Sequence, residues 1–470
     1  MNLKLYNTMT RSLKSFVPVK PARAGLYACG PTVYDLAHIG HARASAAFDI
    51  LVRYLRYCGL DVRYVRNFTD VDDKIIKRAQ DLNKPWLELA EDNIRSFNED
   101  MAALGCLPPT DTPRATEYIG QMLEDIEELV RRGRAYDISG DVYFDVGSFP
   151  EYGRLSGRQL SDQEAGARVT VDSRKKNPAD FALWKTSRPG EPAWPSPWGP
   201  GRPGWHTECS AMSFRLLGSR FDIHGGGQDL IFPHHENELA QAEALGRSLA
   251  EIWVHNGFVN INNEKMSKSL GNVFNIKDVL NLYPAEAVRY FLVTRHYRSP
   301  LDFSEEALKE SWKALERIYR TLALVPPVPE NGENGRAAEP PEIRRSRERF
   351  EQAMDDDLNT AQAMGVIFEM VHELNRTVQA GDQKASGILR RALMQLGQVL
   401  NLWQGDPQAF LEAKKVSARI SAGEVEELIR SRTEARQRKD WAEADRLRQE
   451  LASLGVVVED GAGRTSWHYA

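Results

Sequence analysis

The stretch from Gly25 to Thr69 constrains the fold of this chain most, because it alternates between strand-like and helix-like sequence. A short apolar run, a helix-compatible stretch and a second apolar run follow one another at residues 26–29, 38–57 and 62–68. Gly30-Pro31 ends the first run, and Gly59 stands where a helix-terminating glycine is expected. This order and spacing favour a right-handed βαβ unit, so we expect an α/β protein with a Rossmann-type parallel sheet.

The sheet is expected to be interrupted by an insertion, because the next strand-like runs come only at residues 220–224 and 252–261. Residues 115–199 contain short strand-like pieces such as Asp141–Phe144. Residues 188–200 are too rich in proline and glycine for a helix or a central strand. The pattern predicts an inserted α+β subdomain that ends in a long loop.

The last third of the chain is predicted to be mainly helical. A linker-like run at residues 325–342 precedes Phe350, Met354 and Leu358, which form an apolar i, i+4, i+8 stripe. One helix face near the C-terminus carries Ala444, Leu447, Leu451 and Leu454, and a strand is predicted after it at residues 455–459. We expect a parallel-sheet domain at residues 1–114 and 200–255, with its insertion at residues 115–199. The region at residues 256–324, which contains Lys265 and Lys268, follows this domain. A helical bundle is expected at residues 343–403 and a small C-terminal domain at residues 415–470.

Composition describes an ordinary soluble globular protein. The 470 residues include 61 Lys and Arg and 66 Asp and Glu, for a net charge of -5, and 42% are hydrophobic. These proportions exclude a disordered, collagen-like or disulfide-rich chain, and a polyanion partner would have to bind local basic patches. The four cysteines form no CxxC pair, and the sequence shows no secretory signal and no membrane-length apolar run. We therefore expect a cytoplasmic protein.

The histidines and cysteines are compatible with a metal site. Five of the ten histidines lie between His206 and His255. After Pro233, His234 and Glu238 stand at i and i+4 of a predicted helix and share a face, whereas His235 is rotated by about 100° and is not expected to join them.

With Cys29 after the first strand and Cys209 further along, these residues would make a chemically sound zinc site of two thiolates, one imidazole and one carboxylate. Alternatively, both cysteines are small core residues, and His234 and Glu238 are an ordinary polar pair on a surface helix.

Two short motifs are more specific. His38-Ile39-Gly40-His41 begins the first predicted helix, where two histidines one turn apart would face phosphate groups beside the positive helix end. Gly40 lets a nucleotide approach the backbone. Lys265-Met266-Ser267-Lys268-Ser269 lies in a predicted mobile loop, where its lysines can neutralise the charge of a departing pyrophosphate. The presence of both motifs in this order argues against a chance match.

The two motifs match the HIGH and KMSKS signatures, and the chain therefore resembles the class I aminoacyl-tRNA synthetases. The surrounding sequence narrows the resemblance to the cysteinyl-tRNA synthetase family. The matching segments are residues 29–35, 67–74, 203–212, 224–238 and 440–445. Small departures, such as Phe68 and Thr207, affect none of the expected ligands. The resemblance covers nearly the whole chain and implies a helical bundle and an anticodon-binding domain after the catalytic domain.

The resemblance implies one zinc ion held by Cys29, Cys209, His234 and Glu238, to which the substrate cysteine binds through its thiolate. A thiol on zinc loses its proton near neutral pH and a hydroxyl does not, so serine is rejected without an editing site. An apolar pocket would gain only about 1–3 kcal/mol from so small a difference. Binding of the substrate to a metal with four protein ligands requires expansion to five-coordination. Thr69 and Trp205 resemble the residues that complete the amino-acid pocket.

The implied reaction has two steps: cysteine attacks the α-phosphate of ATP to give an adenylate, and the cysteinyl group is then transferred to the 3′ end of tRNA(Cys). Catalysis consists of positioning and charge stabilisation, without a covalent nucleophile on the protein. His38, His41 and Lys268 are the expected catalytic residues. ATP, with Mg²⁺, is expected to contact these residues and also Gly40, Asp229 and Lys265.

The resemblance also places anticodon recognition in the C-terminal segment, at Arg436, Trp441 and Asp445. Trp441 can stack on a base, and the two charged side chains can bond to base edges. The alternative is a plain amphipathic helix end.

Two other functions compete with a synthetase. A tRNA-independent ligase that joins cysteine to a small amino sugar would not need these residues, and a non-catalytic paralogue would not need both motifs. We expect a monomer.

Overall fold

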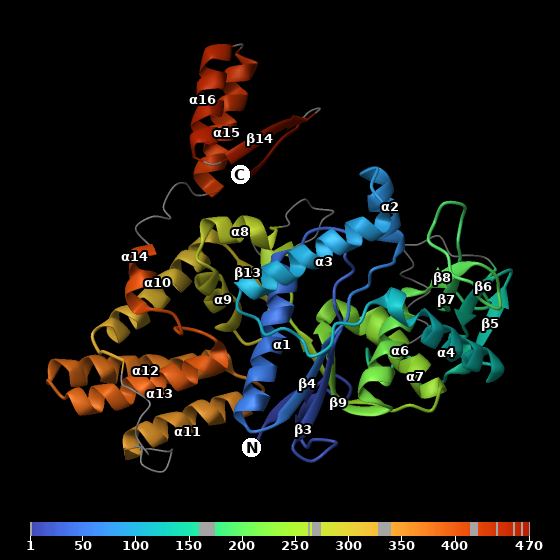
Figure 1. Cartoon of the computed structure of the whole chain (residues 1–470), viewed down its shortest axis with the longest axis horizontal. Helices are drawn as coiled ribbons and strands as arrows, with labels where there is room; N and C mark the ends of the chain where they lie inside the picture. Colours follow the sequence, from blue (N-terminus) through green and yellow to red (C-terminus); the bar gives the residue numbers. More distant parts are fainter. Residues whose placement is uncertain are drawn as a thin grey trace. The chain divides into compact units, whose positions relative to one another are not determined.

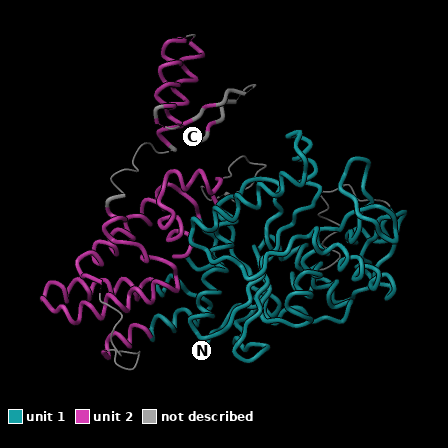
Figure 2. The backbone as a smooth tube through the Cα atoms, in the orientation of Figure 1, with its two compact units in different colours: residues 1–259, 295–301, 348–363 teal, residues 260–294, 302–347, 364–470 magenta. Residues whose placement is uncertain are grey.

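The structure is a computed structural model of the chain. It describes residues 2–158, 174–261, 264–265, 274–327, 340–413, 422–438, 440–454, 456–461 and 464–469. Two compact units are present (Figure 2): one comprises Met1–Val259, Arg295–Leu301 and Glu348–Ala363, and the other comprises Asn260–Thr294, Asp302–Arg347 and Met364–Ala470.

A parallel four-stranded sheet is the centre of the first unit. Its strand order is β10-β9-β3-β4, with β3 at Arg23–Ala28, β4 at Asp61–Arg66, β9 at Arg220–Gly227 and β10 at Leu249–Asn256. The predicted βαβ unit is confirmed, because helix α1 (Ile39–Tyr57) joins β3 to the parallel strand β4 (Figure 1). The run at residues 252–261 is not one strand: β10 ends at Asn256, and β11 (Val259–Ile261) begins a different sheet.

Helices cover this sheet because its strands carry apolar side chains. Helices α6 (Trp205–Leu217) and α7 (Glu236–Ala244) contribute Met212 and Leu239 to a core cluster with Tyr27, Val65 and Trp253 of the strands. Helix α1 packs against β4 and β10. Burial of these large side chains is the main force that holds the sheet and its helices together.

The inserted segment folds as a separate antiparallel layer. Its strand order is β5-β6-β7-β8, at Ala135–Ile138, Asp141–Phe144, Phe181–Thr186 and Gly201–Pro203, and α4 (Ile119–Arg131) packs against it. Its core includes Ile126, Leu129, Phe144 and Trp184. Residues 187–200 contain neither a helix nor an extended strand, as their proline and glycine content predicts.

The first unit also contains an N-terminal hairpin and further helices, and one strand of the hairpin lies against the parallel sheet. Strands β1 (Lys4–Asn7) and β2 (Ser12–Ser15) form an N-terminal hairpin, and β1 lies against β10. Helices α2 (Asp73–Asp81) and α3 (Trp86–Ala103) follow β4. Helix α11 (Pro341–Asp355) contributes residues to both units.

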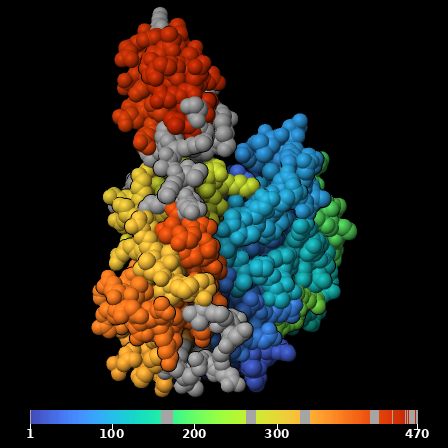
Figure 3. Space-filling model, turned by 60° about the vertical axis from the view of Figure 1, so that its left-hand side comes forward, coloured from blue at the N-terminus to red at the C-terminus, as the bar shows by residue number. Residues whose placement is uncertain are grey.

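The second unit is mainly helical. Its helices, apart from the C-terminal segment, are α8 (Ile276–Leu282), α9 (Ala285–Val293), α10 (Glu305–Ala323), α12 (Thr360–Gln379), α13 (Gln383–Leu400) and α14 (Pro407–Ala413), and β11 pairs in a small sheet with β12 (Glu264–Lys265) and β13 (Leu301–Phe303). Helices α12 and α13 lie side by side (Figure 1), and the hydrogen bond from Ser386 Oγ to Thr377 Oγ1 at 3.0 Å joins them at one end. Their residues are orange in the space-filling view (Figure 3). The predicted stripe of Phe350, Met354 and Leu358, which belongs to the first unit, is buried, although helix α11 ends before Leu358.

The C-terminal segment contains α15 (Ala422–Gln437), α16 (Trp441–Ser453), β14 (Val456–Gly461) and β15 (Arg464–Tyr469). The predicted apolar face is confirmed by the burial of Ala444, Leu447 and Leu451, and the strand predicted after it is β14. Among the described residues, every helix is either too short or too polar to span a lipid bilayer.

Candidate active site and metal cluster

The polar side chains of interest gather at the carboxyl edge of the parallel sheet. Cys29 directly follows β3, Thr69 follows β4, His224 lies in β9 and His255 stands next to the last residue of β10. Strand ends at this edge are where α/β proteins bind ligands. The chain therefore assembles its site from segments that are far apart in sequence and adjacent only in the sheet.

Four predicted metal ligands meet at this edge. One ligand atom each from Cys29, Cys209, His234 and Glu238 lies within 4.8 Å of the others. His234 Nε2 lies 3.0 Å from Glu238 Oε1, and the Cys29 thiol donates to the same oxygen at 3.4 Å. Helix α6 supplies Cys209, and His234 stands in the irregular turn just before α7. The predicted sharing of a face by His234 and Glu238 is found, because i, i+4 residues are neighbours on a helix.

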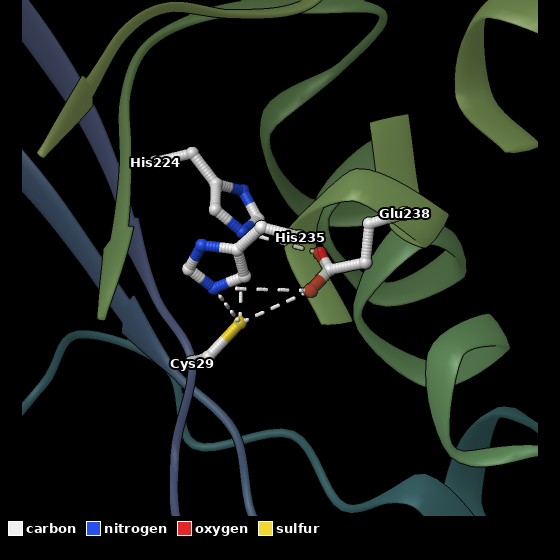
Figure 4. A group of neighbouring side chains, drawn as sticks. All are labelled: Cys29, His224, His235 and Glu238. Carbon is white, nitrogen blue, oxygen red and sulfur yellow. Dashed lines mark hydrogen bonds and ion pairs between the residues drawn. The ribbon is translucent and has the colours of Figure 1, made fainter. Parts of the chain in front are cut away.

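A second group of potential ligands shares Cys29 and Glu238 but contains His224 and His235 instead of Cys209 and His234 (Figure 4). His235 Nε2 lies 3.2 Å from Cys29 Sγ and 4.0 Å from Glu238 Oε1, so the expectation that His235 would stay apart is wrong. Its position i-3 from Glu238 is also on the helix face, and the strand end brings Cys29 to it. His224 Nε2 contacts Glu238 Oε2 at 3.1 Å and Cys29 Sγ at 3.5 Å.

Glycine makes room for this cluster. The strand β9 ends in the triplet Gly225-Gly226-Gly227, next to the turn that carries His235. A Cβ atom at Gly226 would lie 2.7 Å from the Leu230 side chain and 3.2 Å from the ring of His235, which is closer than side chains normally pack. The glycine run thus allows a buried imidazole to lie directly against a β-strand.

Burial and mutual contact shift the pKa values of the cluster strongly. Burial raises the pKa of the Cys29 thiol well above its usual range. Burial also opposes ionisation of Cys209, but hydrogen bonds with Cys29 and His234 bring its pKa down to about 6. Despite burial, His224 and His234 hold the pKa of Glu238 well below its usual range, and Glu238 in turn raises that of His234 to about 10. The cluster therefore gathers negative charge, which a proton on His234 or a bound cation can balance.

Neighbouring side chains orient the predicted ligands and pocket residues. His206 Nδ1 lies 3.0 Å from His234 Nδ1, which leaves the Nε2 atom of His234 directed at Glu238. The Trp205 ring stacks on the His234 ring with centroids 4.1 Å apart. The Thr69 hydroxyl donates to Glu208 Oε2 at 2.5 Å, and both side chains are buried. Trp205 thus lies against a predicted ligand, and Thr69 is held by Glu208, the residue before Cys209.

The two histidines of the first motif organise the start of α1. His38 is the N-cap: its Nδ1 accepts a hydrogen bond from the Gly40 N–H at 3.1 Å, and the His38 N–H donates to His41 Nδ1 at 3.2 Å. The two rings stack with centroids 3.9 Å apart. This reciprocal capping was not anticipated from the sequence, although a capping box is known for other residue pairs. It fixes both imidazoles at the helix end where an anion would bind.

The other predicted nucleotide contacts are described only in part. Asp229 is exposed just beyond β9, in the short turn Gln228–Leu230. The backbone of Lys265 belongs to β12, and Lys268 lies outside the described residues. The three predicted anticodon residues are exposed: Arg436 near the end of α15, and Trp441 and Asp445 one turn apart on α16, with Trp441 60% exposed. An indole so open to solvent can stack on an unpaired base.

Sequence reasoning missed the residues that surround the predicted ligands, namely His206, His224, His235, His255 and Glu208. The concentration of histidine between residues 206 and 255 was a signal that they share a site. The hydrogen-bond partner of each histidine ring depends on strand register and on the turn before α7. Neither can be derived from the spacing of residues in the sequence.

The sequence was also compared with known families and proteins. Residues 15–313 match tRNA synthetases class I (C) catalytic domain, residues 349–404 match DALR domain, and residues 421–467 match Cysteinyl-tRNA ligase anticodon binding domain. The chain is 50% identical to the cysteine–tRNA ligase of Pelobacter propionicus over 100% of both chains. It is 51% identical to that of Alkalilimnicola ehrlichii over 99% of both chains.

Solved structures with a similar fold have much lower sequence identity. A methionyl-tRNA synthetase of Mycobacterium tuberculosis, in complex with methionyl-adenylate, has a TM-score of 0.57 at 17% identity, covering 83% of this chain and 93% of that one. The LeuRS of Agrobacterium radiobacter K84, in a ternary complex, has a TM-score of 0.60 at 12% identity, covering 84% and 86%. At such identities the likeness concerns the fold alone.

Proposed function

This chain belongs to the cysteine–tRNA ligase family of class I aminoacyl-tRNA synthetases, and on that premise we propose how its own residues select cysteine. Its activity is the ATP-dependent ligation of cysteine to tRNA. We propose that Cys29, Cys209, His234 and Glu238 hold one zinc ion, and that Thr69 and Trp205 line the amino-acid pocket beside it. The observation that carries this proposal is the convergence of two sulfurs, one imidazole nitrogen and one carboxylate oxygen within 4.8 Å.

The donor set fits zinc. Thiolate, imidazole and carboxylate are the ligands that zinc takes in proteins, and mixed sulfur and nitrogen donors disfavour magnesium or calcium. The ring of His234 is oriented through its other nitrogen by His206, as ligating histidines usually are. A bound zinc ion would supply a soft Lewis acid that holds the substrate side chain as a thiolate, for which the hydroxyl of serine is a poor substitute.

Other residues of the protein are proposed to bind cysteine and ATP. Trp205, stacked on His234, closes one side of the pocket, and Thr69 presents a hydroxyl that is fixed by Glu208. We propose that His38 and His41 contact the triphosphate of ATP at the start of α1, with Gly40 allowing close approach of the nucleotide. Asp229 is proposed to contact the ribose, and Lys265 and Lys268 to contact the phosphates, with Mg²⁺ bound to ATP. The cysteine carboxylate then attacks the α-phosphate, and pyrophosphate leaves.

The test of this proposal is ATP–pyrophosphate exchange with cysteine and with serine, before and after removal of zinc by a chelator. We expect cysteine-dependent exchange to be lost with the metal and to return when zinc is added. Serine should support little exchange in either state, with a discrimination greater than the roughly 10–200-fold that an apolar pocket provides. Full exchange by a protein shown to contain no zinc would contradict the proposed metal site.

We propose that Arg436, Trp441 and Asp445 read the anticodon. The Trp441→Ala substitution is expected to raise the KM for tRNA(Cys) about 5- to 150-fold, since stacking on a base contributes about 1–3 kcal/mol. ATP–pyrophosphate exchange, which needs no tRNA, should keep its wild-type rate. Both rates can be measured on one preparation, and a parallel loss of exchange would show that Trp441 has a structural role instead.

The alternative activity, ligation of cysteine to a small amino sugar, gains no support. The sequence match to an anticodon-binding domain covers residues 421–467, which such a ligase would not require. We propose tRNA(Cys), cysteine and ATP as the partners of a monomeric, cytoplasmic enzyme. Aminoacylation of tRNA(Cys) transcripts, together with the mass of the protein in solution, tests these assignments.

A further inference from the structure

Thr8 belongs to none of the sequence motifs, but the packing of β1 against β10 places it beside His255, next to the metal cluster. It directly follows β1, and its N–H donates to the Trp253 carbonyl oxygen at 2.9 Å. The Trp253 N–H donates to Asn7 Oδ1, also at 2.9 Å. His255 comes two residues after Trp253 and therefore points to the same face of β10. This pairing brings the Thr8 hydroxyl to 2.7 Å from His255 Nδ1.

A continuous line of hydrogen bonds leads from Thr8 to Cys29. Beyond the contact of Thr8 with His255, His255 Nε2 lies 2.7 Å from His235 Nδ1, and His235 Nε2 lies 3.2 Å from Cys29 Sγ. Both rings are buried, with exposed fractions of 3% for His255 and 0% for His235. Each ring uses both of its nitrogens in this line, so its orientation is determined at two points.

The direction of these hydrogen bonds follows from the charge on the sulfur. A neutral imidazole carries one N–H and one acceptor nitrogen, so a ring that donates to one partner accepts from the other. A Cys29 thiolate requires a donor, which makes Nε2 of His235 the protonated nitrogen. His235 Nδ1 must then accept from His255 Nε2–H, and His255 Nδ1 must accept from the Thr8 hydroxyl. A hydroxyl can donate there, whereas an aliphatic side chain cannot.

We propose that Thr8 is a positioning residue that acts through His255 and His235 to orient Cys29 as a metal ligand. This inference rests on the metal site of the proposed function. In this arrangement the proton on His235 Nε2 leaves no lone pair directed at a metal, so His235 is not a ligand. Cys29, Cys209, His234 and Glu238 then remain as the ligands, and His235 serves as a hydrogen-bond donor to one of them. Partners of this kind set ligand orientation and metal affinity.

The test compares Thr8→Val, which keeps the shape of the side chain and removes the hydroxyl, with Thr8→Ser, which keeps the hydroxyl. Thr8 is only half-buried, so both variants are expected to fold. The Kd for zinc is measured on the full chain by competition with a chelator. The thiolate-to-metal charge-transfer band is recorded after replacement of zinc by cobalt(II). We expect Thr8→Val to raise the Kd up to about tenfold, the lower end of the cost of losing a ligand's direct hydrogen-bond partner, and to change the band, while Thr8→Ser retains the wild-type values.

The two proposals fail in distinguishable ways. If wild-type protein binds zinc but Thr8→Val has an unchanged Kd and an unchanged band, the role of Thr8 is refuted and the metal site stands. If wild-type protein binds no zinc, both proposals are refuted. If Thr8→Ser loses affinity as strongly as Thr8→Val, the hydroxyl is not the group that matters, and the proposed line of hydrogen bonds is also refuted.

Discussion

Cys29→Ser is expected to abolish tight zinc binding and cysteine activation together. The serine hydroxyl is nearly the same size as the thiol, but it does not ionise near neutral pH and is a poor ligand for zinc. Loss of a partner that merely orients a ligand already costs about 10- to 100-fold in metal affinity, so loss of a ligand should cost at least about 100-fold. Metal content after dialysis and ATP–pyrophosphate exchange with cysteine measure the two effects.

Cys58→Ser is the matched control for this substitution. Cys58 is half-buried like Cys29, but it caps the C-terminal end of α1 and belongs to neither group of potential metal ligands. Its replacement should leave zinc content and exchange unchanged. A Cys29→Ser protein with normal zinc content and normal exchange would remove Cys29 from the metal site, whatever the behaviour of Cys58→Ser.

Gly30→Ala is expected to disrupt the site without changing any predicted ligand. A Cβ atom at Gly30 would overlap the carbonyl oxygen of Asn67, and the Gly30 N–H donates to Asn67 Oδ1 at 2.8 Å. Both partners are backbone or tightly bonded, so no side-chain rotation relieves the overlap. The chain after β3 must move away from the chain after β4, which displaces Cys29 and Thr69. We expect a loss of about 3 kcal/mol or more in the free energy of unfolding, and at least tenfold slower adenylate formation.

Gly120→Ala provides the comparison. Gly120 lies in α4 of the same unit, and an added Cβ there would meet no atom within 4 Å. Alanine in the helix should raise the free energy of unfolding by about 0.4–1 kcal/mol and leave exchange unchanged. Urea unfolding of the two variants separates the outcomes. Equal free energies of unfolding for Gly30→Ala and wild type would show that the chain after β3 can move away from the chain after β4 without loss of stability.

Local patterns accounted for the features that depend on residues near one another in sequence. The βαβ unit was predictable because strand and helix periodicities appear within about 40 residues of each other. His234 and Glu238 were expected to share a face because helical geometry alone brings i and i+4 together. The same rule failed for His235, since Cys29 approaches it from a strand end about 200 residues earlier in the chain.

The opening βαβ pattern and the two motifs were sufficient to indicate a class I synthetase, because short-range periodicity and motif order are properties of the linear chain. The neighbours of each ligand could not be derived in that way. His224 lies near Cys29 because β9 pairs with β3 in one register, and Thr8 reaches His255 because β1 lies against β10. Register and packing depend on burial of the whole core, so tertiary structure alone determines which imidazoles and which hydroxyl lie next to each predicted ligand.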